Sequence, residues 1–241
     1  MSVTPRRSSL PWLMLFSRLV LFAVVQALIA VVLLLLGTSE AWSESARWWV
    51  FSAIVTNVVS ILLLVRLFRV EGKRYLDILQ FHRKTLWTDL AISIGVFILA
   101  APIGTIPGNA LAEILFGASD VPIAMMFRPL PLWAIFIGFL FPVTIAFSEL
   151  PIYFAYAMPR LEQRLGNAWL ALALASLFLS LQHLTLPLIL DWRFMVWRAL
   201  MFLPFGLYLG LVLRVRPRLL PYLMISHFLI DLLALSTYFA T

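Results

Sequence analysis

The sequence predicts an all-α fold, a polytopic bundle of about seven transmembrane helices. Of its 241 residues, 63% are hydrophobic and only 12% are charged. Apolar runs of about 20 residues recur along the chain, which is the length a helix needs to cross a bilayer. No long stretch alternates with the period of two that a transmembrane β-barrel requires. The chain has no cysteine, which excludes disulfides and thiolate chemistry.

Short polar loops separate the apolar segments. The first segment is longer than a signal-peptide core of roughly 7–15 residues, so we expect it to be an uncleaved span. A re-entrant piece in the connector Pro107–Pro131 would give an eighth crossing. The charged stretch Arg66–Asp89 has apolar residues at helical spacing, which is typical of an amphipathic helix that lies in the membrane interface. We expect one integral-membrane domain, 1–241, with spans at 13–36, 48–68, 86–106, 132–158, 168–186, 194–213 and 219–240.

Loop charge predicts the orientation. With a cytoplasmic N-terminus, 14 of the 18 basic residues fall on the cytoplasmic side, as the positive-inside rule requires. They include Arg6 and Arg7, and also Arg18 at the entrance to the first span; Arg198 is expected near the opposite face. We therefore expect a multi-pass protein of the cell (inner or plasma) membrane. The net charge of +7 does not indicate nucleic-acid binding, because the basic residues lie in short loops beside spans.

Four polar residues lie inside apolar surroundings. Glu149 stands well before the next charged residue, Arg160, and an intramembrane carboxylate is costly enough to indicate function. His183 ends a long apolar run. His227 and Asp231 are four residues apart, so they project from one face of a helix. If these side chains converge, the sequence favours a catalytic site.

The order of these residues resembles a known family, the CAAX protease and bacteriocin-processing (CPBP, or Abi) family of intramembrane proteases. Its members carry Glu-Glu-x-x-x-Arg, often continued by Gly-Tyr-x-x-Pro-Arg-Leu, then Phe-x-x-x-His and His-x-x-x-Asn/Asp. The resemblance covers about 147–232, within an expected catalytic core of about 132–240. Its matching positions here are Glu149, Tyr156, Pro159, Arg160, Leu161, His183, His227 and Asp231.

Several positions depart from the family pattern. Leu150 and Phe154 stand where the motif has its second Glu and its Arg, and Leu179 replaces the Phe. Loss of both members of a buried ion pair is better tolerated than loss of one, so the double change is a compensated variant. A rival register puts Glu149 at the second Glu, with Ser148 and Tyr153 at the other two positions, but it breaks the Pro-Arg-Leu match.

The resemblance implies peptide hydrolysis near the cytoplasmic half of the membrane. Glu149 and His183 would hold and deprotonate a water that attacks the scissile carbonyl. His227 would stabilise the oxyanion, and Asp231 would orient His227. Pro151 removes a helical hydrogen bond close to Glu149 and so favours an open cavity there. We expect no cofactor, although Glu149, His183 and His227 could hold zinc without a His-Glu-x-x-His signature.

Two alternatives stay open. The missing Glu/Arg pair favours a non-proteolytic relative that acts as a membrane scaffold or immunity protein. A proton-coupled transporter could use the same four residues as a relay, although no internal repeat is evident. The expected partners are membrane lipid and a peptide or membrane-protein substrate, with no nucleic acid. The sequence predicts neither the substrate nor the oligomeric state.

Overall fold

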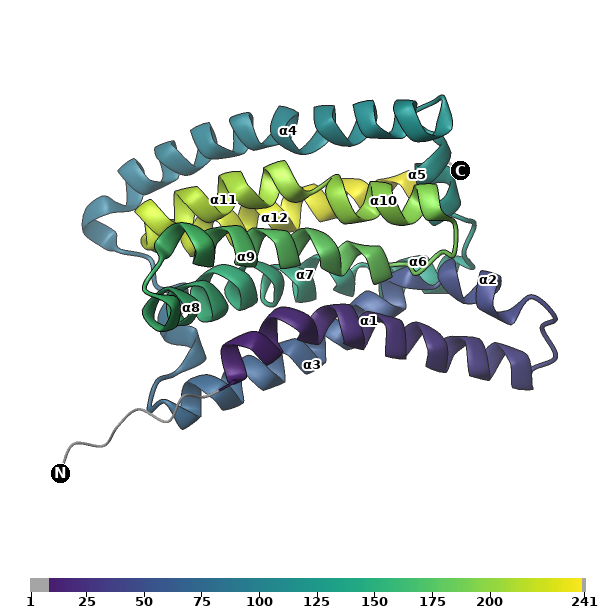
Figure 1. Ribbon diagram of the computed structural model, residues 1–241, viewed down its shortest axis with the longest axis horizontal. Coiled ribbons are helices and arrows are strands. Elements are labelled where there is room, and N and C mark those ends of the chain that lie inside the picture. The colour runs from purple at the N-terminus through teal and green to yellow at the C-terminus, as the bar shows by residue number, and fades with distance from the viewer. Residues whose placement is uncertain (1–8, 240–241) are drawn as a thin grey trace.

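The structure is a computed structural model that describes residues 9–239, and every regular element in that range is helical (Figure 1). Arg6 and Arg7 lie outside the described residues. Seven helical segments are long and apolar enough to cross a membrane, which confirms the predicted all-α bundle. They are Leu10–Leu35, Trp49–Val70, Tyr75–Phe116, Leu132–Leu165, Ala168–Thr185, Trp192–Val215 and Pro217–Tyr238.

The spans are built from long helices and from shorter pieces joined end to end. The first half of the chain contains α1 (Leu10–Leu35), α2 (Ala41–Ala46), α3 (Trp49–Val70), η1 (Tyr75–Leu79), η2 (Arg83–Thr85), α4 (Leu86–Phe116) and α5 (Val121–Met126). The fourth and fifth spans contain α6 (Leu132–Gly138), α7 (Leu140–Ala146), η3 (Pro151–Ala157), α8 (Met158–Leu165), α9 (Ala168–Leu181) and η4 (Gln182–Thr185). The last two contain α10 (Trp192–Leu200), α11 (Leu203–Val215), η5 (Pro217–Leu219), α12 (Leu220–Leu235) and η6 (Ser236–Phe239).

The helices lie side by side in layers. In Figure 1, α4 forms one outer layer and α1 with α3 forms the opposite one. Between them, α11 contacts both α4 and α9, and α7 contacts both α3 and α12. The core has two apolar clusters, and Leu150 belongs to the first while Ile145 belongs to the second. Glu149 thus lies in a segment that takes part in both clusters.

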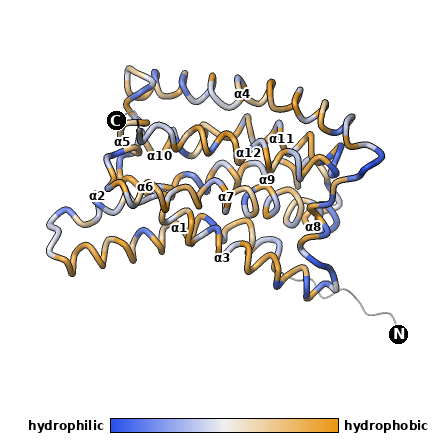
Figure 2. The backbone as a smooth tube through the Cα atoms, turned by 180° about the vertical axis from the view of Figure 1, so that it is seen from behind, coloured by the Kyte–Doolittle hydropathy of each residue, from blue (hydrophilic) through white to orange (hydrophobic). Residues whose placement is uncertain are grey.

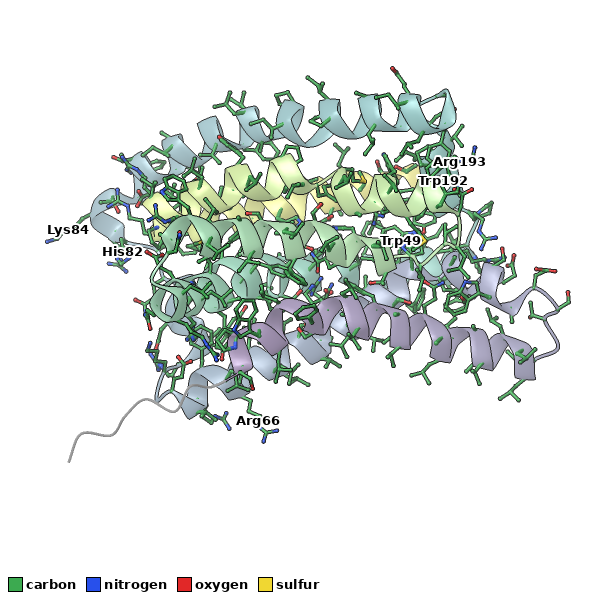
Figure 3. All side chains as sticks on the ribbon, in the orientation of Figure 1. Trp49, Arg66, His82, Lys84, Trp192 and Arg193 are labelled. Atoms are coloured by element: carbon green, nitrogen blue, oxygen red, sulfur yellow. The ribbon has the colours of Figure 1, made fainter. Side chains whose placement is uncertain are left out.

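The polar residues gather at the two ends of the bundle, and its length is mostly apolar (Figure 2). His82 and Lys84 lie at one end, with Arg66 on the outer edge of α3 toward that end, and Trp192 with Arg193 lies at the other end (Figure 3). That the end carrying Arg66 faces the cytoplasm stays a prediction.

Ion pairs hold the loops at the end that carries Arg66. Arg218 Nε lies 2.8 Å from Oδ1 of Asp89, which is buried. Arg160 Nε donates to Glu71 Oε1 at 2.7 Å. These pairs connect the start of α4 to η5 and the end of α3 to α8.

Two local predictions were wrong. The third span does not end at 106, because α4 continues through Pro102 and Pro107 to Phe116. Prolines are tolerated inside transmembrane helices, where local adjustments and neighbouring groups satisfy the freed carbonyls. The stretch Arg66–Asp89 also forms no amphipathic α-helix after α3: it makes the two short turns η1 and η2. There, buried Tyr75 donates a hydrogen bond from its hydroxyl to the Phe147 carbonyl.

The pair between Arg160 and Glu71 gives a pH-dependent prediction. The hydrogen bond from the Arg160 side chain lowers the pKa of Glu71 from its ordinary value of 4.5. A carboxyl group with a depressed pKa stabilises the fold at pH values above its ordinary pKa, and this stabilisation is lost as the pH falls through the lower, folded-state pKa.

We expect Glu71→Gln to lower the melting temperature at pH 7 by about 1–3 °C, because the pair is near the surface. The difference from the unsubstituted protein should close below pH 4.5. Thermal unfolding across this range checks it, with exposed Glu40→Gln as the control; a difference that persists in acid would contradict it.

Candidate active site

Glu149 lies in the break between α7 and η3. Its side chain is 2% exposed. The chain after it does not continue as an α-helix, because Pro151 opens the π-helical segment η3. Single π-helical turns occur often at functional sites, where they redirect side chains. This backbone break turns the Glu149 carboxylate into the interior of the bundle.

His183 is presented by a second break, where α9 gives way to the 3-10 turn η4. Its Nδ1 lies 2.9 Å from the Leu179 carbonyl oxygen, so Nδ1 carries the proton and donates. Nε2 is then an acceptor, and it lies 3.9 Å from Glu149 Oε2. That separation is too long for a direct hydrogen bond and fits groups joined through one water.

His227 and Asp231 approach Glu149 from α12. His227 Nε2 lies 3.5 Å from Glu149 Oε1 and 3.2 Å from Asp231 Oδ2. His227 Nδ1 is buried and has no hydrogen-bond partner among residues 9–239. The imidazole therefore turns its Nε2 edge to both carboxylates. The structure brings all four predicted site residues together around Glu149.

A cavity of about 400 Å³ adjoins this cluster. All four residues line it, and its remaining walls are mostly apolar, with Phe97 of α4 and Phe205 of α11 among them. Leu229 and Leu233 also line it, and both are exposed on α12. The cavity therefore extends from the polar cluster to the outer surface of the bundle between α4 and α12.

Arg18 is a site residue that the sequence reasoning assigned wrongly. It does not lie at the entrance to its span: its side chain is fully buried within α1, and Nη2 lies 3.7 Å from Glu149 Oε2. Nη1 donates to Ser148 Oγ at 2.9 Å, and Nε donates to Gln182 Oε1. Buried acceptors from two other spans hold the guanidinium, so it does not extend to the membrane surface. The rule that identified Glu149, a lone charge inside an apolar run, applies equally to Arg18.

The sequence reasoning did not identify Gln182 as a site residue. Its Nε2 donates to Glu149 Oε2 at 2.5 Å, so its amide bridges Arg18 and Glu149. The hydrogen bonds continue from Ser148 Oγ to Asn57 Oδ1 at 3.0 Å and from Asn57 Nδ2 to Thr144 Oγ1 at 3.1 Å. Polar side chains in apolar spans were the available signal, but three of these four hydrogen bonds join residues more than 80 positions apart in the sequence.

Arg198, which was expected near the opposite face, supports the site in a way that the sequence did not reveal. It is buried within α10, where Nε donates to the His183 carbonyl at 3.2 Å and Nη2 donates to the Leu186 carbonyl. The guanidinium thereby gives the Leu186 carbonyl a donor and adds a second donor to the His183 carbonyl, which also accepts from the Leu186 N–H at 3.1 Å. Arg198 holds the backbone that carries His183.

The two apolar replacements in the first motif are core residues. Leu150 and Phe154 are both buried. Phe154 packs so closely on α11 that a Cβ built at Gly210 would lie 2.6 Å from its ring. These positions carry no charge toward Glu149, and the cation beside that carboxylate comes from α1. Among the described residues, no group of three His, Cys, Asp or Glu side chains could hold a metal ion.

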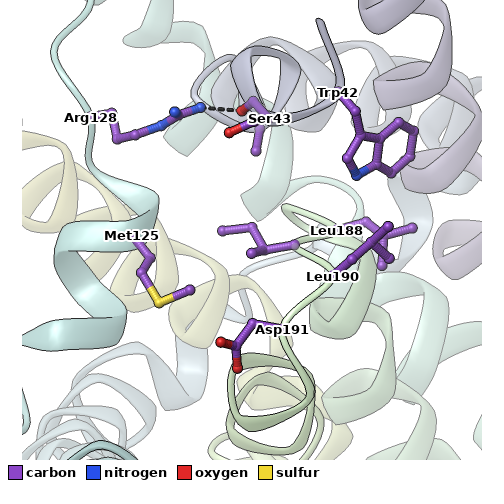
Figure 4. A pocket seen from close by; sticks show the side chains of 9 residues that line it. Trp42, Ser43, Met125, Arg128, Leu188, Leu190 and Asp191 are labelled. Atoms are coloured by element: carbon purple, nitrogen blue, oxygen red, sulfur yellow. Dashed lines mark hydrogen bonds between the residues drawn. The ribbon is translucent and has the colours of Figure 1, made fainter. Parts of the chain in front are cut away.

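A second pocket, of about 380 Å³, lies apart from this cluster (Figure 4). Arg128 donates to the Ser43 carbonyl at its rim. Asp191 caps α10 by accepting from the backbone N–H groups of Arg193 and Phe194 at 2.8 and 3.2 Å. The hydrogen bond from the Arg193 side chain lowers the pKa of Asp191, so this carboxylate is engaged structurally.

Loss of Arg198 should destabilise the site's scaffold. Arg198→Met would leave the buried Leu186 carbonyl without its Arg198 donor and would remove one of two donors to the His183 carbonyl, and an unsatisfied buried group costs about 1–3 kcal/mol. We expect the melting temperature to fall by about 5 °C or more. Thermal unfolding of the purified variant measures it, with exposed Arg216→Met as the matched control. Equal stability of the two variants would show that Arg198 does not support the turn.

Comparisons with known proteins identify the C-terminal part of the chain. Residues 130–233 match the family described as type II CAAX prenyl endopeptidase Rce1-like. A search of the curated proteins and a search of the solved structures each found no match. The matched segment contains Glu149, His183, His227 and Asp231, and it excludes α1 to α5. The resemblance to the CAAX protease family is therefore confirmed: residues 130–233 match the Rce1-like family, which is a family of proteases.

Proposed function

We propose that the protein is an intramembrane endopeptidase of the glutamate type, which hydrolyses a peptide bond with a water held by Glu149 and His183. The observation that carries the proposal is the convergence of one carboxylate and two imidazoles beside a cavity inside an apolar bundle. We place the end carrying Arg66 on the cytoplasmic side, because basic loops mark that side of membrane proteins.

The first step is activation of the water. The lone pair on His183 Nε2 accepts one hydrogen of the water, and a Glu149 oxygen accepts the other. As the water oxygen bonds to the scissile carbonyl carbon, Glu149 takes its proton as the general base. The carbonyl π electrons move to oxygen and give a tetrahedral oxyanion.

The second step is collapse of that intermediate. His227 donates from Nε2 to the oxyanion, in a site where a preorganised donor acts far more strongly than in water. Asp231 Oδ2 lies 3.2 Å from the same nitrogen, so the N–H can point to this carboxylate until the oxyanion forms and replaces it as the acceptor. Glu149 then gives its proton to the leaving amide nitrogen while the C–N bond breaks, which restores the carboxylate and releases an acid and an amine.

The cavity favours a substrate that reaches the site from the bilayer. Its apolar walls extend to exposed residues of α12, so an apolar chain attached to the peptide could enter without first being solvated. The match to a family of CAAX prenyl endopeptidases makes a prenylated CAAX peptide the first substrate to test.

The test uses two probes: an internally quenched peptide that ends in a farnesylated CAAX sequence, and an unprenylated peptide that forms an apolar helix. We expect the purified protein in liposomes to cleave at least one of them. Glu149→Gln and His183→Ala should each lower the rate by at least about 100-fold, because a general base is worth that much.

The matched control is Glu113→Gln, which changes an exposed carboxylate on α4 and should keep full activity. Mass spectrometry of the new termini identifies the cleaved bond. Undiminished cleavage by Glu149→Gln would exclude the mechanism. Failure of the unsubstituted protein to cleave either probe would favour the non-proteolytic scaffold, which the replacements at Leu150 and Phe154 suggest.

The proposed mechanism uses no metal, so chelation is an independent test. We expect dialysis against o-phenanthroline and then EDTA to leave the cleavage rate of the same probe unchanged, because the proposed water is held by protein groups alone. Elemental analysis of the purified protein accompanies the assay. Loss of activity that added Zn²⁺ restores, together with one zinc per chain, would replace the glutamate mechanism by a metal-assisted one.

A further inference from the structure

Arg18 is a buried charge that the proposed mechanism does not use. It lies in α1, outside the segment that matches the protease family. Its guanidinium is fully buried, and Phe22 covers it with the ring centroid 5.0 Å from Cζ. Nη2 has no hydrogen-bond partner among the described residues and lies 3.7 Å from Glu149 Oε2. A guanidinium in this position is costly unless it acts on the carboxylate.

We propose that Arg18 and Gln182 form an anchor that holds one oxygen of Glu149 in place, so that the other faces the reacting water. Arg18 is then a positioning residue, supplied by a helix outside the family segment. The inference rests on the proposed protease function, and it extends that function to α1.

The orientation of the Gln182 amide supports the anchor. A guanidinium can only donate hydrogen bonds, so the Gln182 atom that accepts from Arg18 Nε is the carbonyl oxygen. The amide nitrogen of the same side chain must then face Glu149, to which it donates at 2.5 Å. Arg18 therefore determines which end of Gln182 meets the carboxylate.

The two carboxylate oxygens of Glu149 have different surroundings. Oε2 meets Gln182 Nε2, Arg18 Nη2 and His183 Nε2, whereas Oε1 faces His227 Nε2. With Oε2 held, the carboxylate cannot rotate freely about its last bond. Oε1 stays directed toward His227 Nε2, and the proposed attack places the reacting water within reach of this oxygen and of His183 Nε2.

The anchor also supplies the positive charge that the first motif lacks. Phe154 stands at the arginine position and packs on α11, so it supplies no cation. Arg18 supplies the guanidinium from α1, and Ser148 Oγ fixes it by accepting from Nη1 at 2.9 Å. Neither Arg18 nor Gln182 lines the cavity, so neither should contact the substrate.

This separation predicts a specific kinetic signature with the farnesylated CAAX probe. We expect Arg18→Met to lower kcat by about 10- to 100-fold with KM unchanged, because a poorly positioned base slows the chemical step and leaves binding intact. Arg18→Lys keeps the charge and should recover part of kcat. Arg66→Met, an exposed arginine on α3, is the matched control and should match the unsubstituted protein.

A change in KM alone, or an unchanged kcat in Arg18→Met, would overturn the proposal. If Arg18→Met does not fold, Gln182→Met is tested in its place, because it removes the bridging amide at nearly constant volume. The anchor then predicts the same result, a lower kcat with KM unchanged.

A second measurement separates this inference from the protease function. The fall in melting temperature that Arg18→Met causes is measured in two backgrounds, the otherwise unsubstituted protein and the Glu149→Gln variant. If the two residues are paired, Arg18→Met should lower the melting temperature by about 5 °C or more in the first and by clearly less in the second. This result without cleavage of any probe would retain the anchor and reject the protease; equal losses in both backgrounds would reject the anchor.

Discussion

The buried ion pair between Arg18 and Glu149 is the interaction on which the rest of the site depends. A carboxylate inside an apolar bundle is stable only with a counter-charge and hydrogen-bond donors, and no basic residue of its own motif supplies them. Arg18 contributes the charge from α1, and Gln182 contributes a donor from η4. Ser148 and Asn57 then connect the guanidinium to α3. The pairing requirement therefore fixes how α1, α3, α7 and α9 lie against one another.

Breaks in the helices, more than the helices themselves, present the reactive groups. The π-helical η3 follows Glu149, and the 3-10 turn η4 carries His183. Arg198 holds the second break by donating to the His183 and Leu186 carbonyls. The His183 ring is oriented in turn by the Leu179 carbonyl, which leaves Nε2 free to accept from a water. His227 needs no such break, because a regular helix already places it beside Asp231.

The fold was predictable because hydrophobicity alone defines transmembrane spans, and the seven expected spans are present. Glu149, His183, His227 and Asp231 were also identifiable, since each is a titratable residue in an apolar run and their order matches a family. Arg18 and Gln182 were not, because their roles depend on contacts between distant segments. Arg198 was not, because the sequence does not show that its side chain turns back to the His183 and Leu186 carbonyls. Arg18 bonds to a residue 164 positions away. The end of α4 was misjudged because a proline breaks a helix in water more readily than in a membrane bundle.

The central claim is that Glu149 and His183 together hold the attacking water, and a density map that resolves ordered water tests it most directly. The protein reconstituted in a lipid nanodisc, at a resolution near 2 Å or better, would be sufficient. We expect one water between Glu149 and His183 Nε2, within about 3.2 Å of both groups. A dry contact between them, or a His183 ring turned away with Nε2 bonded elsewhere, would contradict this mechanism.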